Sequence, residues 1–309
     1  MKIIDKLLLP VALAFAVAAG GVAAHLARSI PANAAAPDGV ELPIVMYHHV
    51  LKETGRLNQF TISPDEFRMD MQYLKDCGYS PIVIQDLINY VQDGAPLPEK
   101  PVMITFDDGY ESFHEYVYPI LQEYQYKAVY SIVGTYADQY SQIDDHHIRY
   151  SHSTWNELKA MHDSGLVEIQ NHSYDLHHND GARHGAKRKP GENLALYRDL
   201  IVEDLGKLQQ KCEENLGWTP TCFTYPFGQI SSDTLPILKD MGFQAALTCE
   251  EKLNYITGDP EQLYHLRRFN RPHGKSLQSI LQARRNEQRP QKVDAFADIA
   301  VTCDILFRH

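Results

Sequence analysis

The chain has 309 residues, 44% of them hydrophobic, and a formal net charge of −11 at pH 7. This length and composition predict a soluble globular protein of one large domain or two small ones, with a substantial core. Because nucleic acid affinity depends mostly on lysine and arginine that neutralise phosphates, the acidic balance and the lack of a long basic block exclude a nucleic acid partner. The five cysteines show no Cys-x-x-Cys spacing, and their odd number leaves at least one free thiol.

The N-terminus has the pattern of an export signal. Two lysines precede an uncharged apolar run at residues 7–24, and the small-residue stretch PANAAA follows it. Cleavage is expected at the Ala-x-Ala site Ala32-Asn33-Ala34, but the run reaches the ~18 residues that can span a bilayer, so an uncleaved membrane anchor is the alternative. We assign residues 1–38 to a signal peptide or N-terminal anchor with its linker, and residues 39–309 to one folded domain. The mature protein is expected to be extracellular or at the cell surface.

Short apolar runs alternate with helical patterns from residue 41 onward. The predicted strands cover residues 42–50, 101–110, 127–134, 166–172, 220–228, 243–249 and 263–269. The predicted helices cover residues 63–79, 113–125, 153–165, 193–217 and 231–242. The first helix has Ser63 at its N-cap and Glu66 three residues later, which is the pattern of a capping box. The alternation predicts an α/β fold with a parallel sheet, most simply a barrel.

One polar segment, residues 177–193, is too long for an ordinary connection between elements. Its length suits a lid or a rim loop beside a binding site. A solvated surface loop is the alternative.

Two adjacent carboxylates end the predicted strand at residues 101–110. In parallel α/β folds the chemistry gathers at the carboxyl ends of strands, where successive loops face a common crevice. Asp107 and Asp108 follow the apolar run, and Gly109 permits a turn that opens both side chains to that crevice. An isolated Asp-Asp-Gly is most often an ordinary turn with solvated acids, so the assignment of a site requires a second signal.

That second signal is a group of histidines at the end of the predicted strand at residues 166–172. His172 and His177 flank a short loop, and His178 is adjacent. Two imidazoles and one carboxylate leave an open position on a divalent metal, as a hydrolytic site requires for its water. A cation would also offset the repulsion between Asp107 and Asp108, with one acid as ligand and the other as base. A His-rich surface loop is the alternative, because the chain contains 15 histidines.

With these two stretches the chain resembles the polysaccharide deacetylase family, carbohydrate esterase family four with its NodB-homology domain, over about residues 41–285. The family's first motif, Thr-Phe-Asp-Asp-Gly, stands unbroken at Thr105–Gly109. Its second motif, His-Ser/Thr followed by another histidine, stands at His172, Ser173 and His177.

The resemblance implies a distorted parallel (β/α) barrel and assigns roles to the motif residues. Asp107 is the implied general base, and Asp108, His172 and His177 are the implied metal ligands. Zinc is the default metal for such a set, and Ni²⁺, Co²⁺ and Fe²⁺ stay open because affinity alone does not select the ion. The i to i+5 spacing of the two histidines resembles the branch that acts on poly-β-1,6-N-acetylglucosamine in biofilms. His178 is the alternative to His177.

The third family motif, Arg-x-Pro-Tyr-Gly, is incomplete in this sequence. Thr224 stands at the arginine position, and Phe227 stands at the tyrosine position. The family uses the backbone N–H at the tyrosine position to stabilise the oxyanion, so the resemblance implies this role for Phe227. The arginine that pairs with the base must come from elsewhere, and Arg268 is our candidate, with Arg267 next.

Two histidines are candidates for the general acid. His265 fits the late Leu-x-His motif of the family, but it lies in a predicted alternating strand, where a packed or solvated imidazole is expected. His48, at the end of the first predicted strand, matches the Tyr/Phe-His that supplies the acid in the biofilm-polysaccharide branch. We therefore expect His48 to donate the proton and His49 to point to the opposite face.

The resemblance implies a hydrolase that removes N-acetyl groups from N-acetylglucosamine units of an extracellular or cell-wall polysaccharide and releases acetate. One alternative is a non-catalytic, metal-containing carbohydrate-binding protein, which the missing motif arginine makes conceivable. Another is an O-acetyl esterase of the xylan type on the same fold. A spare carboxylate beside a complete ligand set favours an enzyme, since binding alone requires no base.

Overall fold

The computed structural model describes residues 39–143, 145–179 and 183–288. The predicted export segment, residues 1–38, lies outside these residues, as does Cys303. Among the helices of the described part, none combines the length and the hydropathy needed to cross a bilayer.

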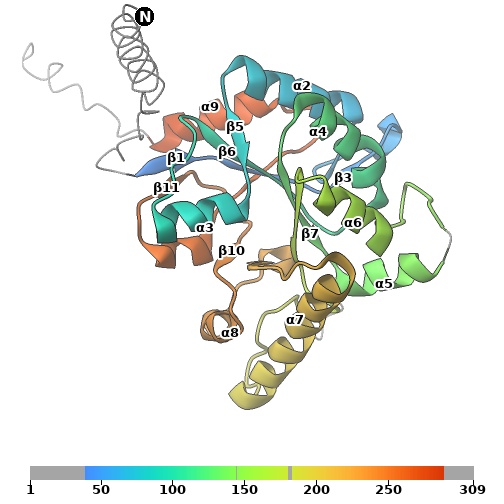
Figure 1. Ribbon diagram of the computed structural model, residues 1–309, viewed down its shortest axis with the longest axis vertical. Coiled ribbons are helices and arrows are strands. Elements are labelled where there is room, and N and C mark those ends of the chain that lie inside the picture. Colours follow the sequence, from blue (N-terminus) through green and yellow to red (C-terminus); the bar gives the residue numbers. More distant parts are fainter. Residues whose placement is uncertain (1–38, 144, 180–182, 289–309) are drawn as a thin grey trace, which may run out of the picture.

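A curled parallel sheet forms the centre of the fold (Figure 1), and its strands follow the order β10-β9-β8-β7-β6-β2-β12. These strands are β2 (Ile44–Tyr47), β6 (Pro101–Phe106), β7 (Ala128–Ile132), β8 (Val167–Asn171), β9 (Cys222–Thr224), β10 (Ala245–Leu247) and β12 (Phe269–Asn270). An eighth strand, β5 (Ser80–Ile82), pairs with the first half of β6. Every ladder of this sheet is parallel. An isolated parallel bridge joins Leu247 in β10 to Leu266, which precedes β12, and the predicted distorted α/β barrel is confirmed as a half-barrel.

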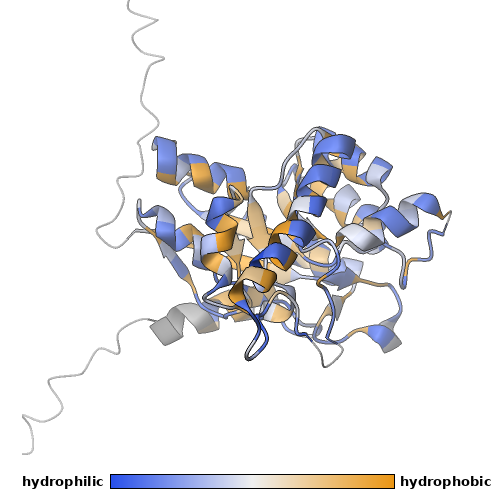
Figure 2. Cartoon of the chain, turned by 90° about the horizontal axis from the view of Figure 1, so that it is seen from below, coloured by the Kyte–Doolittle hydropathy of each residue, from blue (hydrophilic) through white to orange (hydrophobic). Residues whose placement is uncertain are grey.

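Helices surround the sheet on the outside. They are α2 (Pro64–Asp76), α3 (Ile84–Asp93), α4 (Tyr118–Tyr124), α5 (Gly134–Gln142), α6 (Trp155–Asp163), α7 (Leu194–Leu216), α8 (Thr234–Asp240) and α9 (Leu277–Gln288). Figure 1 shows α2, α4 and α9 at one end of the molecule and α7 and α8 at the other. Figure 2 shows apolar strands in the interior and helices whose polar residues face outward, as burial of one helix face requires.

Two small ladders lie beside the main sheet. β1 (Val40–Leu42) pairs antiparallel with β11 (Asn254–Ile256), and β3 (His49–Val50) pairs parallel with β4 (Thr61–Ile62). Short turns of other helix types occupy Thr54–Arg56, Phe113–Val117, Pro226–Gly228 and Pro260–His265.

The predicted capping box at the start of α2 is confirmed. The Ser63 hydroxyl accepts from the backbone N–H of Glu66 at 3.1 Å, and the Glu66 carboxylate accepts from the backbone N–H of Ser63 at 3.0 Å. These bonds satisfy two helix-terminal donors, and replacement of such a cap by alanine typically costs about 1 kcal/mol. Thr154 and Glu157 begin α6 in the same way.

Packing around β6 fixes the point where the strand ends. All residues of this strand are buried. Phe106, its last residue, stacks on Tyr47 with 4.9 Å between ring centroids and meets the edge of Phe113 at the same distance. Such aromatic pairs contribute about 0.5–1.5 kcal/mol each beyond the area they bury. The backbone that leads into Asp107 is therefore held by close packing.

The prediction of a strand at residues 263–269 is wrong for most of that segment. Pro260–His265 forms a 3₁₀ helix, begun by Asp259, whose side chain accepts from the backbone N–H of Glu261. Only Phe269 and Asn270 join the sheet, as β12. A proline at the first position and an aspartate cap direct this segment into a helix in spite of its alternating apolar residues.

Candidate active site

Side chains that follow the ends of β2, β6, β8, β9 and β10 meet in one cavity of about 410 Å³. Asp107 and Asp108 follow β6, His172 and His177 follow β8, and His48 follows β2. The cavity wall also contains Tyr110 and three groups that sequence reasoning did not select, Met46, Phe60 and Cys249. Arg268, which precedes β12, lies behind Asp107.

Asp108, His172 and His177 form a compact group of ligand-type atoms. Oδ1 of Asp108 lies 3.4 Å from Nε2 of His172 and 3.2 Å from Nε2 of His177. Donor atoms that each lie about 2.0–2.2 Å from one zinc ion in tetrahedral geometry are roughly this far apart. The donor set and its spacing therefore fit a divalent transition metal.

His172 is oriented by a hydrogen bond on its other ring nitrogen. Nδ1 lies 2.9 Å from the carbonyl oxygen of Thr224, which can only accept, so Nδ1 carries the proton. Nε2 then has a free lone pair toward Asp108 and a metal. Thr224 replaces the motif arginine in sequence, and its backbone orients a predicted metal ligand.

Backbone strain gathers at the three motif loops. Asp108, Ser173 and Phe227 have φ angles of 74°, 77° and 56°, in the left-handed region that L-residues avoid. Among the described non-glycine residues, Gln125 is the remaining one with positive φ. Each such conformation costs of order 1–3 kcal/mol and persists where the surrounding structure imposes it, which is typical of functional sites.

Arg268 holds both carboxylate oxygens of Asp107. Nη1 lies 2.7 Å from Oδ1 and Nη2 lies 2.8 Å from Oδ2, and the guanidinium is 0% exposed. Burial alone would raise the pKa of Asp107, but the charge and the hydrogen bonds of Arg268 outweigh it, and the pKa is lowered from its ordinary value. Asp107 thus favours its ionised form and lies apart from the group of Asp108, His172 and His177. Arg267 instead pairs with Glu250, at 3.2 Å.

His48 lies in the same cavity as these carboxylates. Its Nδ1 is buried and has no hydrogen-bond partner among the described residues, and its ring contacts Phe60 with 5.0 Å between centroids. Burial lowers the pKa of His48 below its ordinary value, and the charges of Asp108 and Asp107 act in the opposite direction. An imidazole so placed can exchange a proton with a group in the cavity.

His49 also lines the cavity, contrary to the expectation that it points away. β2 ends at Tyr47 and β3 begins at His49, so strand alternation does not continue across His48. The ring nitrogens of His49 lie 2.7 Å from the hydroxyl of Ser112 and 3.3 Å from the carbonyl oxygen of Arg149.

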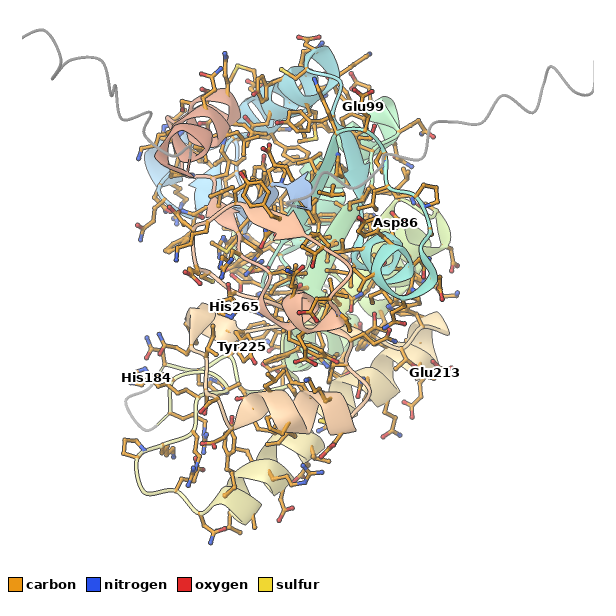
Figure 3. The ribbon with its side chains drawn as sticks, turned by 90° about the vertical axis from the view of Figure 1, so that its left-hand side faces the viewer. Asp86, Glu99, His184, Glu213, Tyr225 and His265 are labelled. Atoms are coloured by element: carbon orange, nitrogen blue, oxygen red, sulfur yellow. The ribbon has the colours of Figure 1, made fainter. Side chains whose placement is uncertain are left out.

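The other candidate histidines lie outside the cavity. His178 is exposed and pairs with Asp175 at 3.1 Å, so it does not replace His177. His265 is exposed and pairs with Glu250 at 2.8 Å, and Figure 3 shows it on the segment that precedes β12.

The described part of the insertion packs against the loop that carries Phe227. A Cβ at Gly185 would lie 2.8 Å from the carbonyl oxygen of Pro226, and Ala186 is buried beneath the hydroxyl of Tyr197. Figure 3 shows His184 at the outer edge of this segment, whereas the buried Tyr225 lies inside the fold. These described residues therefore form part of the rim of the site beside Phe227.

Residues 94–246 match the family model described as polysaccharide deacetylase. The poly-beta-1,6-N-acetyl-D-glucosamine N-deacetylase of Escherichia coli strain K12 is 29% identical over 227 residues, which cover 68% of this chain and 34% of that protein. The enzyme of the same name from Staphylococcus aureus strain MSSA476 is 26% identical over 204 residues, 66% of each chain. The chain thus spans about one third of the E. coli relative.

Two solved structures share the fold at a similar level of identity. A de-N-acetylase from Aggregatibacter actinomycetemcomitans has a TM-score of 0.68 and 27% identity, and the match covers 79% of this chain and 99% of that one. IcaB from Ammonifex degensii has a TM-score of 0.64 and 27% identity, with coverage of 80% and 96%. Together with the two motifs that meet in one cavity, these matches show a polysaccharide deacetylase domain in this chain, with the family model spanning residues 94–246.

Proposed function

We propose that this chain is a metal-dependent hydrolase that removes N-acetyl groups from N-acetylglucosamine units of an extracellular polysaccharide and releases acetate. The observation that carries the proposal is the division of two adjacent carboxylates between two tasks. Asp108 faces two imidazoles, whereas Asp107 forms an ion pair with Arg268. A site that only bound a metal or a sugar would require no ionised base beside the ligand set.

Asp108, His172 and His177 would hold the metal. When bound, a divalent ion, most simply zinc, lowers the pKa of a water molecule and polarises a carbonyl group. The native metal among Zn²⁺, Ni²⁺, Co²⁺ and Fe²⁺ is set by supply and geometry as much as by the ligands.

Asp107 would act as the general base. It accepts a proton from the water that attacks the acetamide carbonyl carbon, and Arg268 keeps the carboxylate ionised until then. The backbone N–H of Phe227 would donate to the oxyanion of the tetrahedral intermediate. The left-handed backbone of Phe227 supports this role, because it is a costly conformation held at the cavity wall.

His48 would act as the general acid. The carbon–nitrogen bond of the intermediate breaks, the electron pair passes to nitrogen, and His48 protonates the departing amine. Acetate and a free amino sugar result. The cavity position of His48 and its unpartnered Nδ1 support this assignment.

The substrate proposal rests on the relatives and on the cavity wall. Both curated relatives described above are named for poly-β-1,6-N-acetylglucosamine. The half-exposed rings of Phe60 and Phe227 border the cavity and provide apolar faces of the kind on which sugar rings pack. We also propose that residues 1–38 direct export or membrane attachment and that residues 39–309 form the deacetylase domain, so that the chain meets its polymer outside the cytoplasm.

The missing motif arginine was the feature that favoured a non-catalytic binder. Arg268 supplies a bidentate partner for Asp107, so the missing motif arginine no longer favours a non-catalytic binder.

Acetate release from β-1,6- and β-1,4-linked N-acetylglucosamine oligomers, peptidoglycan and acetylated xylan would test the proposal. We expect release from the N-acetylated polymers, its loss on chelation, and its return with added Zn²⁺ or Co²⁺. Release from xylan alone would favour the O-acetyl esterase. No release from any acetylated glycan by metal-loaded protein would overturn the enzymatic proposal.

A further inference from the structure

A second cluster of imidazole and carboxylate groups lies outside the residues that line the active-site cavity. Glu111 follows the catalytic turn, His146 lies in the segment between α5 and α6, and Glu157 lies in the first turn of α6. Nδ1 of His146 is 3.0 Å from Oε1 of Glu111 and 3.7 Å from Oε1 of Glu157. His114 approaches from another side, with Nδ1 3.3 Å from the same Glu157 oxygen.

The active-site cluster provides an internal standard for these distances. There the nitrogen–oxygen separations are 3.2 and 3.4 Å, close to the roughly 3.3 Å expected between ligands on one tetrahedral ion. The nitrogen–oxygen distances in the second cluster, 3.0, 3.3 and 3.7 Å, lie around this value. The second oxygen of Glu157 caps α6 through the Thr154 N–H and hydroxyl, both at 2.8 Å, and this contact fixes the direction in which Oε1 points.

Glu111 carries a buried oxygen without a partner. The residue is 4% exposed, and its Oε2 is buried with no hydrogen-bond donor among the described residues. In the part of the chain that the structure describes, no lysine or arginine pairs with Glu111 or Glu157. A buried carboxylate in this setting requires a cation or a proton.

We propose that Glu111, His146 and Glu157 bind a second divalent cation, with His114 within reach as a further ligand. Mixed imidazole and carboxylate ligands suit transition metals such as Zn²⁺, whereas Ca²⁺ prefers six to eight oxygens. This site is separate from the proposed catalytic metal and does not depend on the reaction.

The position of the cluster gives the cation a structural task. The Glu111 N–H donates to the carbonyl oxygen of Ser151, and the Ser153 N–H donates to that of Gly109, both at 2.9 Å. A cation held by Glu111 and His146 would therefore clamp the segment before α6 onto the turn that carries the catalytic carboxylates.

The clamp would also hold Tyr110. This residue lines the cavity, and its ring stacks between His49 and His152, with centroids 4.2 and 4.8 Å away. His152 belongs to the clamped segment, and Tyr110 is the neighbour of Glu111. Occupancy of the second site would thus stabilise one wall of the active site without contact with substrate.

Metal content of the full chain tests the proposal without any measurement of activity. After loading with zinc and removal of free ion, plasma mass spectrometry should find two zinc ions per wild-type chain. Glu111→Gln and His146→Ala should each retain one. Asp108→Ala should also retain one, and anomalous diffraction at the zinc edge should place it beside Glu111.

His265→Ala is the matched control. His265 is exposed to a similar extent as His146 and pairs with Glu250 at 2.8 Å, but it belongs to neither cluster. This variant should keep two zinc ions, and its melting temperature should rise with zinc as in the wild type, whereas His146→Ala should lose part of that rise.

A wild-type stoichiometry of one, with anomalous density only at Asp108, would overturn the proposal and indicate a proton in place of the cation. An equal loss of zinc from His265→Ala and His146→Ala would also overturn it. If Glu111→Gln does not fold, the half-exposed His146→Ala decides the question.

Discussion

Arg268 and Arg271 flank β12, and each forms an ion pair with a buried aspartate. Arg268 contacts the two oxygens of Asp107 at 2.7 and 2.8 Å, and Arg271 contacts those of Asp70 at 2.7 and 3.2 Å. Asp70 also accepts the Tyr47 hydroxyl at 3.0 Å and the first N–H of α9 at 3.3 Å. Those contacts tie α2 to β2, β12 and α9, so this pair joins four elements of the fold.

The two pairs differ in what surrounds the carboxylate. Asp107 and Asp70 are both 2% exposed, and each borders a cavity. The cavity at Asp107 also contains the proposed metal ligands, whereas the oxygens of Asp70 accept from Arg271, from a tyrosine hydroxyl and from a backbone N–H. A buried aspartate–arginine pair is therefore no sign of catalysis by itself. The groups beside the carboxylate distinguish the proposed base from the structural acid.

Asp107→Asn should have the largest effect. An amide cannot accept the proton of the attacking water, so acetate release should fall by about 10³-fold or more, or about 4 kcal/mol in the barrier. Zinc content should not change, because the ligands are intact. Asp70→Asn makes the same chemical change in the other pair and should retain most of its activity per folded molecule. Normal turnover by Asp107→Asn would refute its role as the base.

Asp70→Asn should show its effect in stability. Removal of one partner leaves the buried Arg271 charge to Glu66, 3.4 Å away, so the cost should lie at the lower end of the range for a broken buried pair, about 3 kcal/mol. Urea unfolding followed by circular dichroism would measure the change in unfolding free energy. A loss below about 1 kcal/mol, the range of surface ion pairs, would contradict the structural role of this pair.

Acid titration should probe the same network through Glu66. Burial opposes ionisation of this carboxylate, but the backbone N–H groups of Ser63 and Gly274, His273 and Arg271 outweigh it and lower the pKa to about 2. Because the folded pKa is below that of the unfolded chain, 4.5, the contribution to stability is present above pH 4.5 and is lost as the pH falls toward 2. The full shift corresponds to about 3.4 kcal/mol, and screening by solvent should reduce the difference in unfolding free energy between wild type and Glu66→Gln to about 2 kcal/mol at pH 6, with convergence near pH 2. A gap that is independent of pH would be inconsistent with this assignment.

Arg268→Lys should have the smallest effect. Lysine keeps the charge but not the bidentate contact, so the pKa of Asp107 should rise and the acid limb of the kcat/KM profile should move to higher pH by about one unit, or about 1.4 kcal/mol. Arg271→Lys, the matched change in the other pair, should leave the profile in place. An unchanged profile in both variants would show that Arg268 does not set the ionisation of Asp107.

The sequence predicted the parts of the fold that are encoded locally. Long apolar runs ending in polar motifs located β6 and β8, and Ser63 with Glu66 located the start of α2, because these signals act over a few residues. The convergence of Asp108, His172 and His177 came from the family resemblance together with the rule that parallel strands end at a common edge.

Features that depend on tertiary context could not be predicted in this way. α3, α5 and α9 were not assigned, although none of them is shorter than the predicted helix α6, and the alternating residues before β12 form a 3₁₀ helix. Arg268 and Arg267 are equivalent in sequence, and only the path of the chain decides that the first reaches Asp107. The second cluster joins single residues from three separate segments, so no motif marks it.

The parts of the site are synthesised at different times, because the strands that carry them are far apart in sequence. Asp107 and Arg268 are 161 residues apart and meet across β2, which lies between β6 and β12. During synthesis on the ribosome, the last of the three proposed metal ligands, His177, is added well before Arg268. Arg268 is the partner of Asp107, the proposed base. A nascent or truncated chain that ends short of Arg268 would contain the proposed ligands but leave the proposed base without its partner, so we expect hydrolytic competence only after β12 has been added.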